Sequence, residues 1–482
     1  DEDKLVEEAI IKMLAQLDPH STYSDAEEVK KMNEPLQGNF EGIGVQFQMI
    51  EDTLLVVQPV SNGPSEKIGI LAGDRIIAVN DSAIAGVKMS TEEIMKRLRG
   101  PKGSKVNLKI VRRGVQDPLV FTVKRDKIPI LSLDASYMIQ PKTGYIRINR
   151  FGATTAEEFK KAMKELQKQG MKDMILDLQG NGGGYLNAAI DLANEFLGQK
   201  ELIVYTEGRT AKRSDFYAKG NGEFRNGRLI VLVDEYTASA SEIVSGAVQD
   251  WDRGIIVGRR SFGKGLVQRP IDLPDGSMIR LTIARYYTPA GRCIQKPYDS
   301  STDYNKDLIE RFNHGELMNA DSIHFPDSLK AQTKKLGRTV YGGGGIMPDY
   351  FVPIDTTLYT DYHRNLVAKG AVIKFTMKFI EGHRKELANK YKKFESFNEK
   401  FIIDDDMLAT LREMGEKEGV KFNEEQYQKS LPLIKTQLKA LIARDLWDMN
   451  EYFRVMNTTN ESVQKALEIL NSEEYQKKLR AN

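Results

Sequence analysis

The chain has 482 residues, of which 40% are hydrophobic and 29% are charged, and its formal net charge is +2. The length predicts about three domains of roughly 150 residues each, and the composition is that of an ordinary globular protein. A net charge this close to zero excludes a strong electrostatic field that would attract nucleic acid or an anionic membrane. The single cysteine, Cys293, excludes an internal disulfide and a cysteine metal cluster.

Residues 1–37 are predicted to form a helical segment. Leu5, Ala9 and Met13 recur at helical spacing, and Asp18-Pro19-His20-Ser21 ends this helix because proline cannot continue it. A second short helix is expected around residues 25–32. The chain starts without an initiator Met, so we expect that a leader was removed or that the chain was trimmed.

Residues 38–125 are predicted to form a compact β-rich module. One helix is expected from Ser90 to Arg99, with Ser90 as its N-cap and Glu93 completing a capping box. Glycine-containing turns separate the apolar runs. These runs indicate strands at residues 45–47, 54–57, 75–79 and 106–111.

Residues 126–355 alternate strands and helices, which indicates an α/β layer with largely parallel strands. Strands are expected at residues 144–148, 174–178, 229–233 and 254–258, and helices at 155–169, 186–197 and 241–249. Thr155 and Glu158 are predicted to form a capping box. The alternating run 278–284 suits a half-exposed antiparallel strand, and about 298–340 reads as an irregular insertion.

Residues 356–482 are predicted to be wholly helical, with helices at 372–391, 406–417, 423–446 and 462–470. Asp404-Asp405-Asp406 fits a metal site or a helix N-terminus, which favours negative charge, and we prefer the second. The apolar stripes of these helices fit a homodimer or a packed domain, and both stay open. No apolar run approaches the ~18–20 residues that span a bilayer.

The candidate chemistry lies between Asp234 and Gln268. Ser239 follows a buried strand, and Lys264 lies between two glycines further along. A serine hydroxyl needs a base, and no histidine falls between residues 21 and 313, so we interpret Lys264 as the base. A lysine can serve if an apolar pocket lowers its pKa. A surface lysine in a glycine turn is the alternative interpretation.

Two motifs in residues 38–125 resemble a PDZ domain of the bacterial protease type. The first is Gly42-Ile43-Gly44-Val45, similar to the carboxylate loop of that domain. The second comprises Pro64-Ser65-Glu66-Lys67 and Ala72-Gly73-Asp74-Arg75-Ile76-Ile77-Ala78-Val79-Asn80. Backbone N–H groups in such a loop form an anion nest, and an exposed edge strand accepts an added peptide strand. The resemblance implies that Gly42, Ile43, Gly44 and Val45 bind a peptide carboxylate.

The candidate stretch resembles the carboxyl-terminal processing peptidases, also called tail-specific proteases. The matching residues are Thr237-Ala238-Ser239-Ala240-Ser241-Glu242-Ile243, Gly258, Phe262-Gly263-Lys264-Gly265 and Gln268. Further matches at residues 17–23, 287–292 and 344–349 extend the resemblance over about residues 5–355. The family implies a ClpP/crotonase-like core. It also implies a nucleophile at Ser239, with Ser241 as the alternative.

The same resemblance implies the other site residues. Lys264 is the base, and Gln268 orients its amine. Ala240 and Gly183 supply the oxyanion donors, with Gly184 as the alternative to Gly183, because this chain has Gly182 where the family commonly has proline. A phosphate-binding loop at residues 179–184 is the weaker alternative, since the loop lacks the Lys-Ser/Thr ending. His20 is expected to have a structural role in its turn.

We therefore expect an α/β multidomain serine endopeptidase, with a PDZ domain at 38–125, a protease core at 126–355 and an all-helical extension at 356–482. It is expected to recognise polypeptides by their free C-termini and cut near that end. No metal, cofactor, nucleic acid or membrane span is expected, and the location is expected to be extracytoplasmic, in the periplasm or cell envelope. Two alternatives stay open: a peptide-binding adaptor with an inactive protease-like body, and a Ser–His hydrolase that uses His314 or His324.

Overall fold

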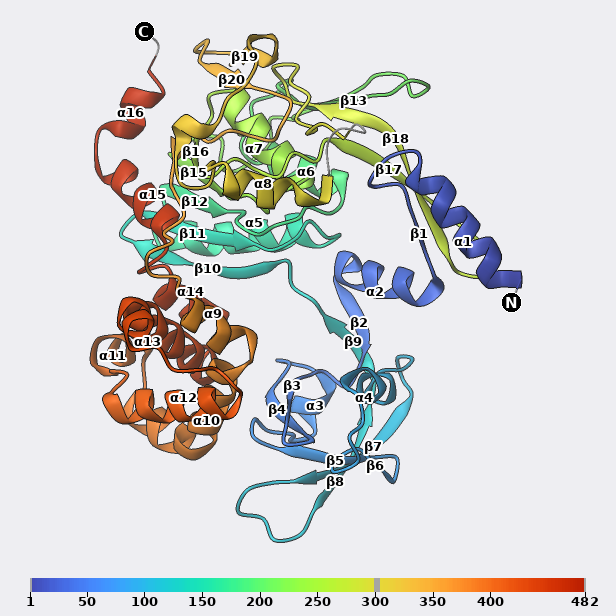
Figure 1. Ribbon diagram of the computed structural model, residues 1–482, viewed down its shortest axis with the longest axis vertical. Helices are drawn as coiled ribbons and strands as arrows, with labels where there is room; N and C mark the ends of the chain where they lie inside the picture. Colours follow the sequence, from blue (N-terminus) through green and yellow to red (C-terminus); the bar gives the residue numbers. More distant parts are fainter. Residues whose placement is uncertain (1, 299–303, 481–482) are drawn as a thin grey trace. The chain divides into compact units, whose positions relative to one another are not determined.

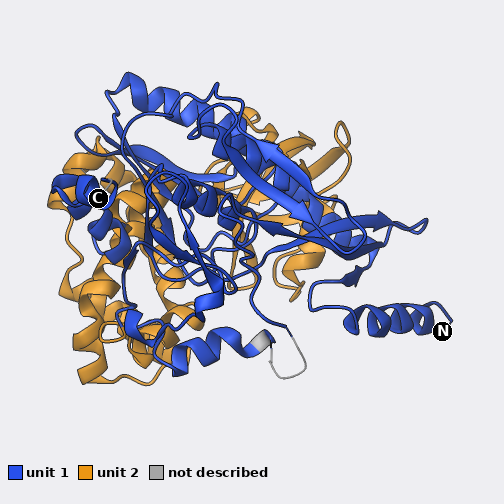
Figure 2. Ribbon diagram, turned by 90° about the horizontal axis from the view of Figure 1, so that it is seen from above, with its two compact units in different colours: residues 1–38, 131–355, 457–482 blue, residues 39–130, 356–456 orange. Residues whose placement is uncertain are grey.

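The computed structural model describes residues 2–298 and 304–480 (Figure 1). The chain forms two compact units (Figure 2). Unit 1 comprises Asp1–Gly38, Leu131–Asp355 and Asn457–Asn482, and unit 2 comprises Asn39–Ile130 and Thr356–Met456. Residues 299–303 of the predicted insertion lie outside the described residues. Both units are therefore assembled from segments that are far apart in the sequence.

The core of unit 1 is a six-stranded sheet in the order β10-β11-β12-β15-β16-β21. β10 pairs antiparallel with β11, and the remaining pairs are parallel, as the alternation of strands and helices predicted. The strands are β10 (Leu133–Gln140), β11 (Thr143–Ile148), β12 (Asp173–Asp177), β15 (Leu229–Val233), β16 (Ile255–Gly258) and β21 (Tyr350–Phe351).

One face of this sheet is covered by three helices, α5 (Thr155–Lys168), α6 (Leu186–Asn194) and α7 (Ala240–Asp250). Apolar side chains of these helices and alternate strand residues form one buried cluster. The capping box predicted at Thr155 is wrong. Thr155 is already helical, and the Glu158 carboxylate accepts hydrogen bonds from the backbone N–H groups of Ser132 and Leu133 instead.

A second sheet of unit 1 runs in the order β1-β18-β13-β14, with β17 paired to β18. β17 and β18 are antiparallel, which agrees with the prediction for residues 278–284. The strands are β1 (Thr22–Ser24), β13 (Leu202–Glu207), β14 (Ser214–Tyr217), β17 (Leu266–Asp272) and β18 (Met278–Tyr287). The remaining elements up to residue 355 are α1 (Glu2–Ala15), α2 (Ala26–Gln37), η1 (Tyr304–Lys306), α8 (Asp307–Asn313), η2 (Ala320–Ser322), η3 (Asp327–Leu329), β19 (Lys330–Gln332) and β20 (Thr339–Tyr341).

The last part of the chain returns to the core of unit 1. α15 (Glu461–Asn471) packs against β15 and β16, and α16 (Glu474–Lys478) follows it. The Tyr475 hydroxyl accepts a hydrogen bond from the Leu229 N–H at the start of β15. The predicted helical domain over residues 356–482 is therefore divided at residue 457, because its last segment packs on the sheet rather than on the preceding helices.

Unit 2 contains the β-rich module and a helical part. The helices Asp361–Ala368 (α9), Ala371–Lys390 (α10), Phe394–Lys400 (α11), Asp405–Lys417 (α12), Glu424–Leu446 (α13) and Met449–Met456 (α14) pack around their own apolar cluster. Asp404 caps α12, since its carboxylate accepts from the Met407 N–H. The module comprises β2 (Asn39–Gly42), β3 (Val45–Ile50), β4 (Thr53–Pro59), α3 (Pro64–Lys67), β5 (Arg75–Val79), β6 (Ser82–Ala83), α4 (Thr91–Leu98), β7 (Lys105–Val111), β8 (Leu119–Lys124) and β9 (Asp126–Pro129).

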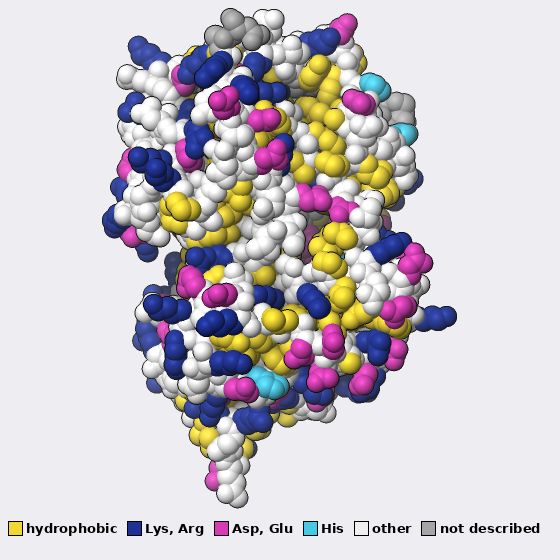
Figure 3. All heavy atoms as spheres, turned by 90° about the vertical axis from the view of Figure 1, so that its left-hand side faces the viewer, with side chains coloured by type: hydrophobic (Ala, Val, Ile, Leu, Met, Phe, Trp, Pro, Cys, Tyr) yellow, Lys and Arg dark blue, Asp and Glu magenta, His cyan; other side chains and the backbone are white. Residues whose placement is uncertain are grey.

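The surface mixes the two signs of charge. On the face drawn in Figure 3, basic and acidic side chains are interspersed, which fits the net charge of +2. Among the described residues, no helix is both long and apolar enough to cross a membrane.

Candidate active site

Ser239 lies where the chain passes from β15 into α7. Its φ of 58° and ψ of −115° place it in the left-handed half of backbone space, which is strained for a residue with a side chain and is frequent at functional sites. The side chain is half-buried. Ser241, the alternative nucleophile, is fully buried, and its hydroxyl donates to the Asn181 carbonyl at 2.9 Å. The geometry therefore favours Ser239 over Ser241.

Lys264 lies in the turn before β17, between Gly263 and Gly265. Burial is the main cause that lowers the pKa of its amine, and the positive charge of Arg280 lowers this pKa further. Both effects favour the neutral amine that a base requires. In the part of the chain that the structure describes, no hydrogen bond joins Lys264 Nζ to Ser239 Oγ.

Glu242 connects the two halves of the site, and the sequence interpretation gave it no role. Its Oε2 accepts from the N–H groups of Ser239 and Lys264, and its Oε1 accepts from the Gly263 N–H and the Ser261 hydroxyl. The carboxyl group is fully buried, and this burial raises its pKa to about 7. The spacing Ser239-x-x-Glu242 at a helix start is that of a capping box, and this pattern could have indicated from the sequence that Glu242 binds the Ser239 backbone.

Gln268 is on β17, and its side-chain N–H₂ donates to the backbone carbonyl of His20. Among the described residues, no hydrogen bond joins Gln268 to Lys264, so its orienting role stays a prediction. His20 lies in the turn where the Asp18 carboxylate accepts from its N–H at 2.8 Å. Burial is the main cause that lowers the pKa of the His20 imidazole to about 4, and the nearby charge of Lys264 also lowers it.

The glycine loop after β12 lies directly against the nucleophile. A Cβ atom added to Gly183 would be 2.7 Å from the Ser239 Cβ and 3.0 Å from the Ala240 nitrogen, so a side chain cannot fit there. The Gly183 N–H donates to Asn181 Oδ1 at 2.9 Å. Within residues 2–298 and 304–480, the N–H groups of Ala240 and Gly184 make no hydrogen bond.

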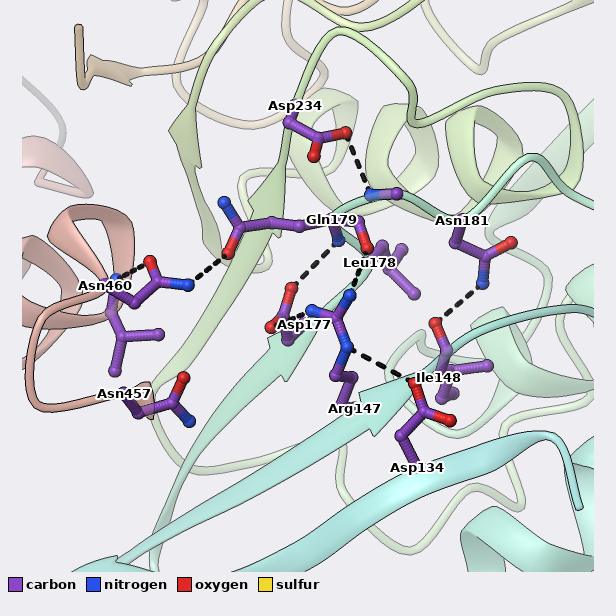
Figure 4. A network of polar contacts seen from close by, with 12 residues as sticks. Asp134, Arg147, Ile148, Asp177, Leu178, Gln179, Asn181, Asp234, Asn457 and Asn460 are labelled. Carbon is purple, nitrogen blue, oxygen red and sulfur yellow. Dashed lines mark hydrogen bonds and ion pairs between the residues drawn. The ribbon is translucent and has the colours of Figure 1, made fainter. Parts of the chain in front are cut away.

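A polar network holds this loop in place (Figure 4). The Asp177 carboxylate at the end of β12 accepts from Arg147 Nη1 at 2.6 Å and from the Gln179 N–H at 2.8 Å. Asn181 Nδ2 donates to the Ile148 carbonyl at 2.9 Å. The loop is thus fixed to β11 and β12, and on the other side the Asn181 carbonyl accepts from the Ala238 N–H and the Ser241 hydroxyl.

His314 and His324, the alternative bases, are both exposed in the insertion. No hydrogen bond of either side chain to Ser239 is found among the described residues. The described residues also contain no group of acidic, histidine or cysteine side chains placed to hold a metal ion.

The β-rich module of unit 2 contains an apolar pocket of about 420 Å³ between the loop at Gly42–Val45 and α4. Ile43, Gly44 and Val45 line it from the loop, and the other lining residues are Phe40, Gln46, Phe47, Thr91, Met95, Leu98 and Arg99. Gly44 has a φ of 73°, and a Cβ atom there would meet Ile128 at 2.9 Å. The predicted carboxylate loop therefore borders an apolar pocket.

Known proteins match both units. Residues 142–302 match peptidase family S41, residues 42–127 match the PDZ domain, and residues 362–448 match a family of unknown function. The photosystem II D1 C-terminal processing protease is a structural neighbour at 28% identity and a TM-score of 0.39, covering 74% of this chain and 84% of that chain.

Two curated relatives extend the match. The carboxy-terminal-processing protease of Bartonella bacilliformis is 40% identical over 302 residues, which are 61% of this chain and 68% of that protein. The carboxy-terminal processing protease CtpA of Bacillus subtilis is 38% identical over 297 residues, 61% of this chain and 63% of that protein. Ser239, Lys264 and Gln268 lie within residues 142–302, the stretch that matches peptidase family S41. By these matches, this chain belongs to peptidase family S41, together with the carboxy-terminal processing proteases.

Proposed function

We propose that the protein is a serine endopeptidase that binds the free C-terminus of a polypeptide on its PDZ domain and cuts the polypeptide near that end. Ser239 is the nucleophile and Lys264 is its base. The observation that carries this proposal is the shared carboxylate: Glu242 Oε2 holds the backbone of Ser239 at 2.8 Å and that of Lys264 at 2.9 Å.

In the acylation step, neutral Lys264 Nζ accepts the proton of Ser239 Oγ while this oxygen attacks the scissile carbonyl carbon. The carbonyl oxygen becomes an oxyanion, which accepts a hydrogen bond from the Ala240 N–H at the start of α7. For Gly183 to be the second donor, its N–H must turn from Asn181 Oδ1 toward the substrate. Gly184 is the alternative second donor, because its N–H is not engaged.

Collapse of the intermediate breaks the peptide bond, and Lys264 gives the proton to the leaving amine. Lys264 then takes a proton from a water molecule, whose oxygen attacks the carbonyl carbon of the acyl-enzyme. Collapse of this second intermediate breaks the bond to Ser239 Oγ, Lys264 returns the proton to that oxygen, and the second product leaves as the acid. Gln268 is proposed to orient the Lys264 amine through its side-chain oxygen, while its N–H₂ is held by the His20 carbonyl.

The pocket beside Gly42–Val45 supports recognition of the substrate terminus. Backbone N–H groups of a glycine loop can bind the carboxylate, and the pocket beside them is apolar enough for a hydrophobic last side chain. The preferred substrate is therefore an unstructured polypeptide with an apolar C-terminal residue.

The test uses a soluble unstructured protein with an apolar C-terminus. Ser239→Ala and Lys264→Ala are each expected to abolish its cleavage and the labelling of the protein by a fluorophosphonate, while Ser241→Ala keeps both. Circular dichroism and thermal melting check that the variants are folded. Cleavage by Ser239→Ala at the wild-type rate would refute the proposal.

One observation favours a second candidate, a peptide-binding adaptor with an inactive protease-like body. Lys264 Nζ and Ser239 Oγ are not hydrogen bonded, and the Gly183 N–H is occupied by Asn181. Catalytic hydrogen bonds are often long without substrate, so the same geometry fits a resting enzyme. Absence of both cleavage and fluorophosphonate labelling in the wild-type protein would favour the adaptor.

We also propose an extracytoplasmic location, which fractionation of cells that express the protein tests. A homodimer is likewise a proposal, which light scattering of the purified protein tests directly.

A further inference from the structure

The C-terminal segment contacts the first residue of the glycine loop. Asn460, the residue that precedes α15, donates a hydrogen bond from Nδ2 to Gln179 Oε1 at 3.1 Å (Figure 4). The Asn460 Oδ1 atom accepts from the Val463 N–H at 3.2 Å and so caps the helix. One side chain therefore both starts α15 and contacts the loop.

Gln179 is the first residue of the loop that leads to Gly183. Its N–H donates to Asp177 Oδ1 and its carbonyl accepts from Arg147 Nη2, each at 2.8 Å. These two bonds fix its backbone only. The bond to Asn460 is a third attachment, which holds the Gln179 side chain to the C-terminal segment.

The segment that bears Asn460 is itself firmly attached to the core of unit 1. Asn457 is 2% exposed and donates to the Tyr137 hydroxyl at 2.8 Å. At the other end of α15, the Asn471 and Gln140 side chains exchange two hydrogen bonds of 3.0 Å. Asn460 is thus a fixed donor rather than a mobile surface side chain.

We propose that Asn460 is a positioning residue of the active site, which holds Gln179 and thereby the loop that carries the oxyanion donor. The proposal rests on the proposed function, in which Gly183 or Gly184 binds the oxyanion. The consequence is that the segment from Asn457 to the start of α15 supports the catalytic loop, although it follows the helical domain in sequence.

The experiment replaces Asn460 by Ser in the full chain. Serine also caps helices, so α15 keeps its start, but its side chain is too short to reach Gln179. We expect kcat on the unstructured substrate to fall about threefold to tenfold, as for loss of a neutral hydrogen bond in the transition state, with KM unchanged within about twofold. Gln179→Met, which removes the amide at similar length, is expected to have the same effect.

The matched control is Asn471→Ser, which removes an amide pair from the same helix at the end away from the loop. It should leave kcat unchanged. The double variant Asn460→Ser/Gln179→Met should lose no more activity than either single variant, because both remove one interaction. Wild-type kcat in Asn460→Ser, equal losses in Asn460→Ser and Asn471→Ser, or additive losses in the double variant would overturn the inference.

Failure of this inference differs from failure of the proposed function. If Ser239→Ala still cleaves the substrate, the proposed nucleophile is wrong. If Ser239→Ala is inactive while Asn460→Ser keeps the wild-type kcat, only the role of Asn460 is wrong.

Discussion

Ser239 and Lys264 each donate a backbone N–H to the same oxygen, Oε2 of Glu242. The two residues are 25 positions apart and come from different elements, the start of α7 and the turn before β17. A single buried carboxylate therefore sets the distance between the backbone of the nucleophile and the backbone of the base.

Glu242→Gln is expected to damage both catalysis and stability. The glutamine amide presents an N–H₂ where one carboxylate oxygen accepted two donors, so two buried donors lose their acceptor. At about 1–3 kcal/mol for each unsatisfied group, the free energy of unfolding should fall by about 2–6 kcal/mol. Misplacement of Ser239 against Lys264 should lower kcat by about 100-fold.

Steady-state kinetics and denaturant unfolding check this prediction. The control is Glu195→Gln, another buried glutamate of unit 1, which accepts from Lys160 Nζ and the Glu223 N–H. It should lower stability without lowering kcat. Full activity in folded Glu242→Gln would show that the shared carboxylate is not needed.

Arg280→Gln is expected to move the pH profile of activity upward. Burial and then the Arg280 charge lower the pKa of Lys264, because a nearby guanidinium disfavours the ammonium form. Without this charge the pKa of Lys264 rises, so the neutral amine forms at higher pH. The rising limb of log(kcat/KM) against pH should shift to higher pH, whereas Arg269→Gln, at an exposed position on β17, should leave it in place. A shift to lower pH would contradict the assignment of Lys264 as base.

Joint replacement of His314 and His324 by Gln tests the Ser–His alternative. Both side chains are exposed, and neither is hydrogen bonded to Ser239 among the described residues. We expect kcat and KM of the double variant to stay within about twofold of the wild type. A general base contributes roughly 10²–10⁴-fold, so a loss of that size would instead favour histidine as the base.

Met95→Glu tests recognition by the PDZ pocket. Met95 is half-buried in the pocket wall. A carboxylate at this position repels the carboxylate of the substrate C-terminus and makes the pocket less apolar, which weakens binding of an apolar last side chain. KM for a substrate with an apolar C-terminus should rise about tenfold, which corresponds to about 1.4 kcal/mol of binding. Val120→Glu, at a position 70% exposed on β8 and outside the pocket, should leave KM unchanged. Equal KM values for both variants would place substrate recognition elsewhere.

Sequence patterns predicted the parallel core and the antiparallel β18, because buried runs and alternation depend on local residue order. β17 was not predicted. It contains Pro270 and several exposed residues, so it lacks the apolar pattern of a buried strand. The division of the helical extension at residue 457 was also not predictable, since helical spacing does not show which surface a helix covers.

The same limit applies to the site. Spacing and family resemblance named Ser239 and Lys264. However, the Glu242 carboxylate also binds Ser261, Gly263 and Lys264, which are 19, 21 and 22 residues further along the chain, and the partner of Gln268 is His20, 248 residues earlier in the sequence. Such contacts are made by the tertiary fold. A capping-box spacing could suggest a bond within α7, but it could not show that Glu242 also binds the turn at Gly263 and Lys264.

Ile469→Ala tests whether α15 belongs to the core of unit 1. Ile469 is fully buried, and α15 packs on β15 and β16, so removing its side chain leaves a cavity beside the sheet. Substitutions of this kind cost about 2–5 kcal/mol. Because the helix packs on the sheet, this loss should appear in the same unfolding transition as the loss of fluorophosphonate labelling at Ser239.

Denaturant unfolding is followed by circular dichroism, which measures the loss of structure, and by fluorophosphonate labelling, which measures the loss of the active site. The control on the same helix is Glu468→Ala, at an exposed position. Glu468 forms a surface ion pair with Lys465, so its replacement should change stability by less than about 1 kcal/mol. If Ile469→Ala weakened only a transition that leaves labelling intact, α15 would belong with the preceding helical domain. A shared transition is expected because α15 packs against β15 and β16, and β15 leads directly to Ser239.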